Sequence, residues 1–192
     1  MTNTNVVVFG ADSFASLAWY CLTHDSPYRV MAFTVDRAFM RAINGLRRAR
    51  YEGAKAQGYE FVSYVSSRAS TWPDLQVGEN CMIYEHAIIQ PFVRIGDNVI
   101  IRSGAHISHH CQVADHAFVA AGVTFGGNVK LGEQAYVGVG AVLRDRLIVA
   151  ERSFIGAGAV VVSDTEADGV YVGNPARKTA RTALDVTCSR AR

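Results

Sequence analysis

The sequence predicts a small N-terminal α/β domain followed by a parallel β-helix of about five coils. Up to residue 64, short apolar runs alternate with segments of helical spacing. From Val77 to Val161 every sixth residue is apolar, and a mostly small residue stands four positions after each of them. Fifteen consecutive apolar hexad positions exceed chance in a chain that is 49% hydrophobic. A short fixed period of this kind is typical of a solenoid.

The N-terminal elements follow from apolar runs and from the residues that end them. Gly10 ends the first run and Gly58 provides a C-terminal stop for the second helix. Strands alternating with helices predict a parallel α/β unit. The expected elements are a strand over 5–9, a helix over 13–23, a strand over 30–35 closing on Asp36, a helix over 39–57 and a strand over 59–65.

The hexads predict their own coil geometry, because the first and fifth residues of each must both face the core. The residues between them, as in 96–98 and 132–134, are turn formers. Three hexads then close a coil of 18 residues, and neighbouring coils pair as parallel strands about 4.8 Å apart. Residues 18 apart therefore stack in columns. The regular hexads end near Asp164, and the chain after Arg177 is expected to be irregular.

Composition narrows the class of partner and the compartment. The net charge of +2 gives no strong field for nucleic acid. Cys81 and Cys111 occupy inward hexad positions, and Cys21 and Cys188 are expected to be unpaired, which indicates a reducing compartment. The apolar run 6–9 is too short to cross a bilayer. We therefore expect a soluble cytoplasmic protein without nucleic-acid or membrane partners.

Residues 104–143, 155–164 and 170–178 resemble the hexapeptide-repeat acyltransferases with a left-handed parallel β-helix. The whole chain resembles the branch that joins a small nucleotide-binding domain to that helix. This branch includes sialic acid O-acetyltransferase-like proteins and the UDP-amino-sugar N-acetyltransferases of bacterial glycan synthesis. The resemblance implies left-handed coiling, a homotrimer with active sites between neighbouring subunits, acetyl-CoA as acyl donor and a nucleotide-linked sugar as acceptor. The expected division is a nucleotide-sugar-binding-like domain over 1–64, the acyltransferase β-helix over 65–178 and a basic tail over 179–192.

Histidine suits the chemistry of acyl transfer, because a base with a pKa near neutrality must take the proton of the attacking amine or hydroxyl. The resemblance assigns this role to His109 in the segment Ser-His-His-Cys, and the catalytic pair is given as His109 and His110. Many relatives have an acidic residue after the base, whereas this chain has His110. The group that orients His109 is therefore open, with a carboxylate or a backbone carbonyl as candidates. His86 and His116 are interpreted as solvated turn residues.

The 18-residue column places Gly127 one coil beyond His109 and Asn128 one coil beyond His110. A glycine beside the base would let a ligand approach the backbone, and its N–H could donate to the thioester carbonyl. A plain tight turn at Gly126-Gly127 is the alternative. By resemblance, acetyl-CoA lies along Phe118, Gly127, Val139 and Ala157, although some relatives carry a histidine in place of Phe118. The basic pair Arg177 and Lys178 is a candidate for the CoA phosphates.

The N-terminal domain is expected to be a shortened Rossmann-like unit. Of the dinucleotide fingerprint it keeps only the first glycine, Gly10. The resemblance implies that the segment Gly10, Ala11, Asp12 and Ser13, together with Asp36, contacts the nucleotide-linked sugar. Only residues 37–43 separate the second strand from the helix equivalent to 44–57, where relatives have more sequence, so part of the sugar pocket could be missing.

The leading prediction is an acetyl-CoA-dependent N-acetyltransferase that acts on a nucleotide-linked amino sugar in bacterial glycan synthesis. Sugar O-acetylation on a sialic acid-like acceptor is the close variant. A non-catalytic trimeric binding scaffold is the third alternative, favoured by the incomplete glycine motif. A zinc hydratase on the same type of helix is disfavoured, because no two histidines are 18 residues apart. No metal is therefore expected.

Overall fold

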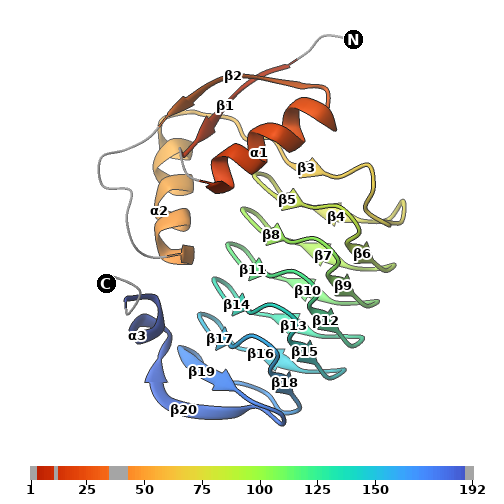
Figure 1. Cartoon of the computed structure of the whole chain (residues 1–192), viewed down its shortest axis with the longest axis vertical. Helices are drawn as coiled ribbons and strands as arrows, with labels where there is room; N and C mark the ends of the chain where they lie inside the picture. The colour runs from red at the N-terminus through yellow and green to blue at the C-terminus, as the bar shows by residue number, and fades with distance from the viewer. Residues whose placement is uncertain (1–3, 11–12, 35–42, 189–192) are drawn as a thin grey trace. The chain divides into compact units, whose positions relative to one another are not determined.

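The computed structural model describes residues 4–10, 13–34 and 43–188 (Figure 1). The chain divides into two compact units, Met1–Met40 and Arg41–Arg192. This division lies upstream of the predicted boundary at residue 64. The second helix expected in the first domain, over 39–57, therefore falls almost entirely in the second unit. The nucleotide-sugar role of residues 1–64 stays a prediction. Among the described residues, no helix is long and apolar enough to cross a membrane.

The N-terminal unit is a two-stranded parallel sheet with one crossover helix. Strand β1 (Thr4–Phe9) pairs with β2 (Tyr28–Thr34), and α1 (Ser13–His24) connects them. Parallel neighbours need such a crossover. The predicted third strand over 59–65 is wrong, because residues 59–63 form no strand. Tyr64 and Val65 form β3, which pairs with β5 in the solenoid.

The second unit is a parallel β-solenoid of about six turns, one more than expected, with three sheets along its sides (Figure 1). Coils stack in the predicted 18-residue register, as in the pairing of Gln112 with Lys130 and of Phe118 with Tyr136. The strands are β3 (Tyr64–Val65), β4 (Gln76–Val77), β5 (Met82–Ile83), β6 (Ile88–Ile89), β7 (Arg94–Ile95), β8 (Ile100–Ile101), β9 (His106–Ile107), β10 (Gln112–Val113), β11 (Phe118–Val119), β12 (Thr124–Phe125), β13 (Lys130–Leu131), β14 (Tyr136–Val137), β15 (Val142–Leu143), β16 (Ile148–Val149), β17 (Phe154–Ile155), β18 (Val160–Val161) and β19 (Gly169–Val172).

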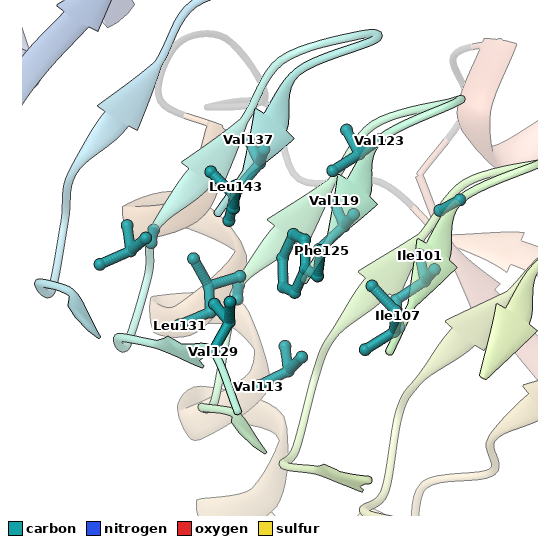
Figure 2. Close-up of a cluster of buried hydrophobic side chains, with 14 of the residues drawn as sticks. Ile101, Ile107, Val113, Val119, Val123, Phe125, Val129, Leu131, Val137 and Leu143 are labelled. Atoms are coloured by element: carbon teal, nitrogen blue, oxygen red, sulfur yellow. The ribbon is translucent and has the colours of Figure 1, made fainter. Parts of the chain in front are cut away.

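The core of the solenoid consists of the hexad residues, as predicted. Figure 2 shows side chains from successive coils, among them Phe125, Val119 and Leu131, meeting inside the solenoid. Phe125 is the largest side chain that is fully buried. The small residues of the pattern, including Cys81 and Cys111, are also fully buried. The hexad period thus encodes one continuous column of apolar contacts.

The corners between strands explain the polar residues of each hexad. At one residue per corner the backbone adopts the left-handed conformation, which Asn, Gly and His tolerate better than most residues. One column of such residues lies just before strands β5, β8, β11, β14 and β17. Its members are Asn80, Asn98, His116, Gln134 and Arg152. The side chain at an equivalent corner position can therefore differ from coil to coil, although the backbone conformation there is the same.

Helix α2 (Ile43–Ala56) lies against one of these corners and belongs to the same compact unit as the solenoid. Asn44 Nδ2 donates to the Gln134 carbonyl over 2.9 Å. The Arg47 guanidinium donates to the carbonyls of Asn98 and His116. Ion pairs Arg48–Glu133 and Lys55–Glu79 add to these contacts. The helix thus caps solenoid backbone that would otherwise face water.

Residues 177–188 form a strand and a helix, which corrects the expectation that the chain after Arg177 is irregular. Strand β19 continues one solenoid sheet, and β20 (Arg177–Thr182) pairs with it antiparallel. Helix α3 (Ala183–Cys188) follows. An antiparallel final strand needs only a tight turn, here 173–176, and it covers the sheet edge that the last coil would leave open.

Candidate functional site

The predicted base lies at the corner between β9 and β10. Both His109 and His110 are exposed there, and His110 has a φ of 60°. The corner is anchored from inside by Cys111, whose thiol donates to the Gly126 carbonyl over 3.2 Å and accepts from the Val129 N–H over 3.3 Å. A buried anchor beside two exposed imidazoles holds them on rigid backbone, which suits a catalytic group.

Gly127 lies directly against the His109 ring, as the column predicts. A Cβ atom added to Gly127 would stand 2.6 Å from His109 Cε1 and 2.8 Å from His109 Nε2. The left-handed residue of this corner is Asn128, with a φ of 62°. The His109 ring, and not the conformation of a tight turn, is therefore what a larger residue at position 127 would displace.

The backbone N–H of Gly127 makes no hydrogen bond within the described residues. Its neighbours do: the Gly126 N–H donates to the Leu143 carbonyl over 2.8 Å, and the Asn128 N–H donates to the His109 carbonyl over 3.0 Å. A free N–H beside an exposed imidazole is the pairing that acyl transfer uses for oxyanion contact and proton transfer.

Three contacts involve the histidine pair. His109 Nδ1 lies 3.1 Å from His110 Nδ1, and the His109 N–H donates to Gln90 Oε1 over 3.0 Å. The ring of Phe92, one coil earlier, lies 4.6 Å from the ring of His110. The sequence argument missed Gln90 and Phe92, although counting back 18 residues from His110 would have found Phe92.

A shallow hollow adjoins the pair on the side of His110. Its volume is about 410 Å³. Five of its seven lining residues are polar or charged, and Phe92 and Val93 add apolar surface. The lining residues are Asp74, Gln76, Phe92, Val93, Arg94, His110 and Gln112.

The other residues expected to contact acetyl-CoA lie elsewhere on the solenoid. Phe118 is buried on β11, and its ring stacks on Tyr136 at 5.1 Å. Val139 and Ala157 are exposed one coil apart, at the corners that follow β14 and β17. These positions belong to a different corner from that of His109. A single chain therefore groups His109, His110 and Gly127 but does not bring Phe118, Val139 and Ala157 to them.

The basic pair near the C-terminus begins β20. Arg177 is exposed, while the Lys178 ammonium already binds the Glu166 carboxylate. This hydrogen bond raises the pKa of Lys178. A lysine with a carboxylate partner has less charge to offer a phosphate, so Lys178 is a weaker candidate than its sequence suggested.

The predicted acceptor residues are only partly described. Gly10 is buried with a φ of 135°, and Ser13 begins α1. Ala11, Asp12 and Asp36 lie outside the described residues, as does most of the short segment 37–43. In the parts that the structure describes, no three His, Cys, Asp or Glu side chains converge as metal ligands would.

His116 corrects one interpretation, because it is buried and not solvated. Only 6% of its surface is exposed. Its ring lies 5.4 Å from the Tyr51 ring of α2, and Asn98 Nδ2 lies 2.9 Å from His116 Nδ1. Burial lowers the pKa of His116. The periodic pattern could not show that a helix covers this corner.

The repeats and the fold define the class: the second unit is a β-solenoid built from hexapeptide repeats. The model of the bacterial transferase hexapeptide family, described by six repeats, matches residues 74–109 and 93–127. No curated protein sequence matches the chain.

Solved structures share this fold. The acetyltransferase domain of PglB from Neisseria gonorrhoeae is 22% identical, with a TM-score of 0.81, 92% of this chain covered and 100% of that one. PerB from Caulobacter crescentus, solved with CoA and GDP-perosamine, is 22% identical, with a TM-score of 0.86 and coverage of 94% and 99%. WeeI from Acinetobacter baumannii is 20% identical, with a TM-score of 0.72 and coverage of 92% and 100%. The chain has the same fold as these proteins along nearly their whole length.

Proposed function

We propose that this protein is an acetyl-CoA-dependent acetyltransferase whose acceptor is the amino group of a nucleotide-linked sugar. The observation that carries the proposal is the free N–H of Gly127 beside the exposed imidazole of His109. The shared fold supports it, because PglB has been solved with acetyl-CoA and PerB with CoA and GDP-perosamine. Hexapeptide repeats of bacterial transferases support it as well.

The residues of the corner would divide the chemistry between them. Acetyl-CoA, when bound, supplies an acyl group activated as a thioester. His109 would take the proton of the attacking amine through Nε2 and later give a proton to the departing thiolate. Gly127 would donate its N–H to the thioester carbonyl oxygen as negative charge develops there. A side chain at position 127 would press on the His109 ring, so glycine is the residue that leaves this imidazole in place.

We further infer that a homotrimer completes the site. The sheet of β6, β9, β12, β15 and β18 lies between the corner of His109 and that of Val139. Its outward side chains include exposed Ile88 (43%) and Val142 (39%). Within the described residues, the buried Nε2 of His106 on the same sheet has no hydrogen-bond partner. Contact through this face would cover apolar surface and could bring Val139 and Ala157 of a neighbouring copy to His109.

The test of activity is release of free CoA thiol from acetyl-CoA, with UDP-, GDP-, dTDP- and CMP-linked sugars that carry either amino or only hydroxyl groups. His109→Asn should lower kcat by about 10²–10⁴ while acetyl-CoA still binds. His86→Asn is the matched control, because His86 is an exposed corner histidine with a φ of 60°. Unchanged turnover in His109→Asn would refute the assigned base, and turnover only on hydroxyl sugars would make the enzyme an O-acetyltransferase. Acetyl-CoA or sugar binding without any turnover would indicate the scaffold.

The test of assembly is the mass in solution by light scattering. The wild-type protein should have three times the mass of one chain. Val142→Glu should dissociate it and abolish turnover, whereas Ile148→Glu, on a neighbouring sheet, should leave the mass unchanged. A monomer that turns over at full rate would refute the shared site.

A further inference from the structure

The two histidines of the corner form a pair with its own chemistry. His109 Nδ1 and His110 Nδ1 are 3.1 Å apart, and the rings meet edge to face at 86°. A neutral imidazole has one N–H and one lone pair, so a hydrogen bond between these atoms needs one donor and one acceptor. No carboxylate contacts His109 among the residues that the structure describes. His110 is therefore the only side chain there that contacts the Nδ1 atom of His109.

The surroundings hold both rings in this arrangement. Gly127 packs against the Cε1–Nε2 edge of the His109 ring, and Gln90 accepts from the His109 backbone N–H. On the other side, the Phe92 ring supports the ring of His110 at 4.6 Å. Contacts on several sides limit rotation of either ring, so the Nδ1 pair is a built feature and not a chance approach.

We propose that His110 is a positioning residue that accepts a hydrogen bond from the Nδ1–H of His109. This bond fixes the tautomer of His109 in which the Nε2 lone pair, on the edge beside Gly127, is free to act as base. The inference rests on the proposed function, because it gives a role to the neighbour of the proposed base. A neutral imidazole thus replaces the carboxylate that such a base commonly has.

A neutral acceptor has consequences that a carboxylate would not have. When His109 takes up a proton at Nε2, its Nδ1–H still donates to neutral His110, but no negative charge offsets the new positive one. A second proton on the pair would make both Nδ1 atoms donors and break the bond. The hydrogen bond between the two rings therefore needs at least one of them to be neutral. The charged groups near them are Asp74 and Arg94 in the adjoining hollow and the Asp145–Arg146 pair at the corner two coils from the histidines.

Three substitutions separate acceptor, charge and backbone effects at position 110. Gly, Asn and Asp all tolerate a φ of 60°, so none should strain the corner. His110→Gly removes the acceptor, His110→Asn keeps a neutral one, and His110→Asp supplies a charged one. His86→Gly is the matched control at an exposed corner with the same φ.

The expected result is a graded loss of kcat with the KM for acetyl-CoA unchanged. His110→Gly should lower kcat by about 10–100-fold, the range known for partners that orient metal-binding histidines. His110→Asn should retain most of the activity. In His110→Asp the carboxylate should favour protonated His109, so the acidic limb of the pH–rate profile should move to higher pH. His86→Gly should behave as wild type.

A second measurement decides the proposal independently of turnover. Nitrogen-15 NMR of the imidazoles should show His109 of the wild-type protein as the Nδ1–H tautomer, with this preference lost in His110→Gly. The proposal is overturned if wild-type His109 carries its proton on Nε2, if His110→Gly keeps full kcat, or if Gly and Asn cost the same. Failure of His109→Asn to lower kcat would instead refute the proposed function, and the NMR result would still decide the pairing.

Discussion

Two corners of one coil carry histidines with nearly the same backbone and opposite surroundings. The corner before β10 has His110 with a φ of 60°, and the corner after β10 has His116 with a φ of 63°. His110 is exposed beside His109, whereas His116 is buried beneath α2 and contacts Asn98 and Tyr51. The repeat thus fixes where a corner side chain stands but not what covers it.

The difference shows that coverage decides the role of a corner. The covered corner offers its carbonyls to α2, which binds them through Arg47 and Asn44. The uncovered corner keeps two exposed imidazoles that a ligand can reach. Coils with the same backbone therefore give a structural corner where α2 covers them and an accessible corner where it does not.

The largest effect is expected from removing the Arg47 side chain, which binds the carbonyls of the covered corner. Arg47→Ala should lower the free energy of unfolding by about 2–3 kcal/mol, because a charged donor to several carbonyls is lost and those carbonyls stay covered by α2. Urea unfolding measures it. Arg47→Lys keeps the charge but not the forked geometry of the guanidinium, so its free energy of unfolding should lie between those of Arg47→Ala and wild type. Equal stability of Arg47→Ala and wild type would show that α2 only rests on the corner. Turnover of the folded protein should be little changed.

The next effect should appear at the uncovered corner, in activity and not in stability. In Gly127→Ala the new Cβ would stand 2.6 Å from His109 Cε1, so the exposed ring must move. A displacement of about 1 Å in a catalytic group costs about 10²-fold in rate, or about 2.7 kcal/mol of barrier. Kinetics with acetyl-CoA and urea unfolding separate the two effects.

Gly53→Ala in α2 is the matched control for this change, because its Cβ would meet nothing within 4 Å. It should keep full activity. If Gly127→Ala instead lost stability and kept its rate, position 127 would serve the fold and not the reaction.

Much of this comparison could be predicted from the sequence, because a solenoid repeats its geometry. The hexads predicted which residues are buried, and the 18-residue column predicted that Gly127 lies beside His109. The coverage of His116 could not be predicted in this way. Helix α2 binds the solenoid through Arg47 and Asn44, which donate hydrogen bonds to backbone carbonyls. Every residue has a backbone carbonyl, so the sequence does not indicate which carbonyls the helix will contact. Tyr64 was likewise assigned to the N-terminal domain, because two residues of strand pattern do not reveal which strand they pair with.

The smallest effect should be the pH dependence that burial gives to His116. Burial lowers its folded pKa below the ordinary value near 6.5, and Asp115 and Glu133 oppose this only in part. Between the two pKa values the unfolded chain binds a proton that the folded chain does not. Stability from this residue is therefore complete above about pH 6.5 and falls as the pH drops toward the folded pKa.

His116→Asn removes the titrating group but keeps an amide beside Asn98 and a residue that tolerates the left-handed backbone, as Asn80 and Asn98 do in the same column. Urea unfolding at pH 7 and pH 5 should then show a smaller loss of stability in the variant than in wild type. An equal loss in both would mean that His116 accepts a proton without leaving its place under α2. In that case water reaches the covered corner, and the contrast with His110 is one of packing alone.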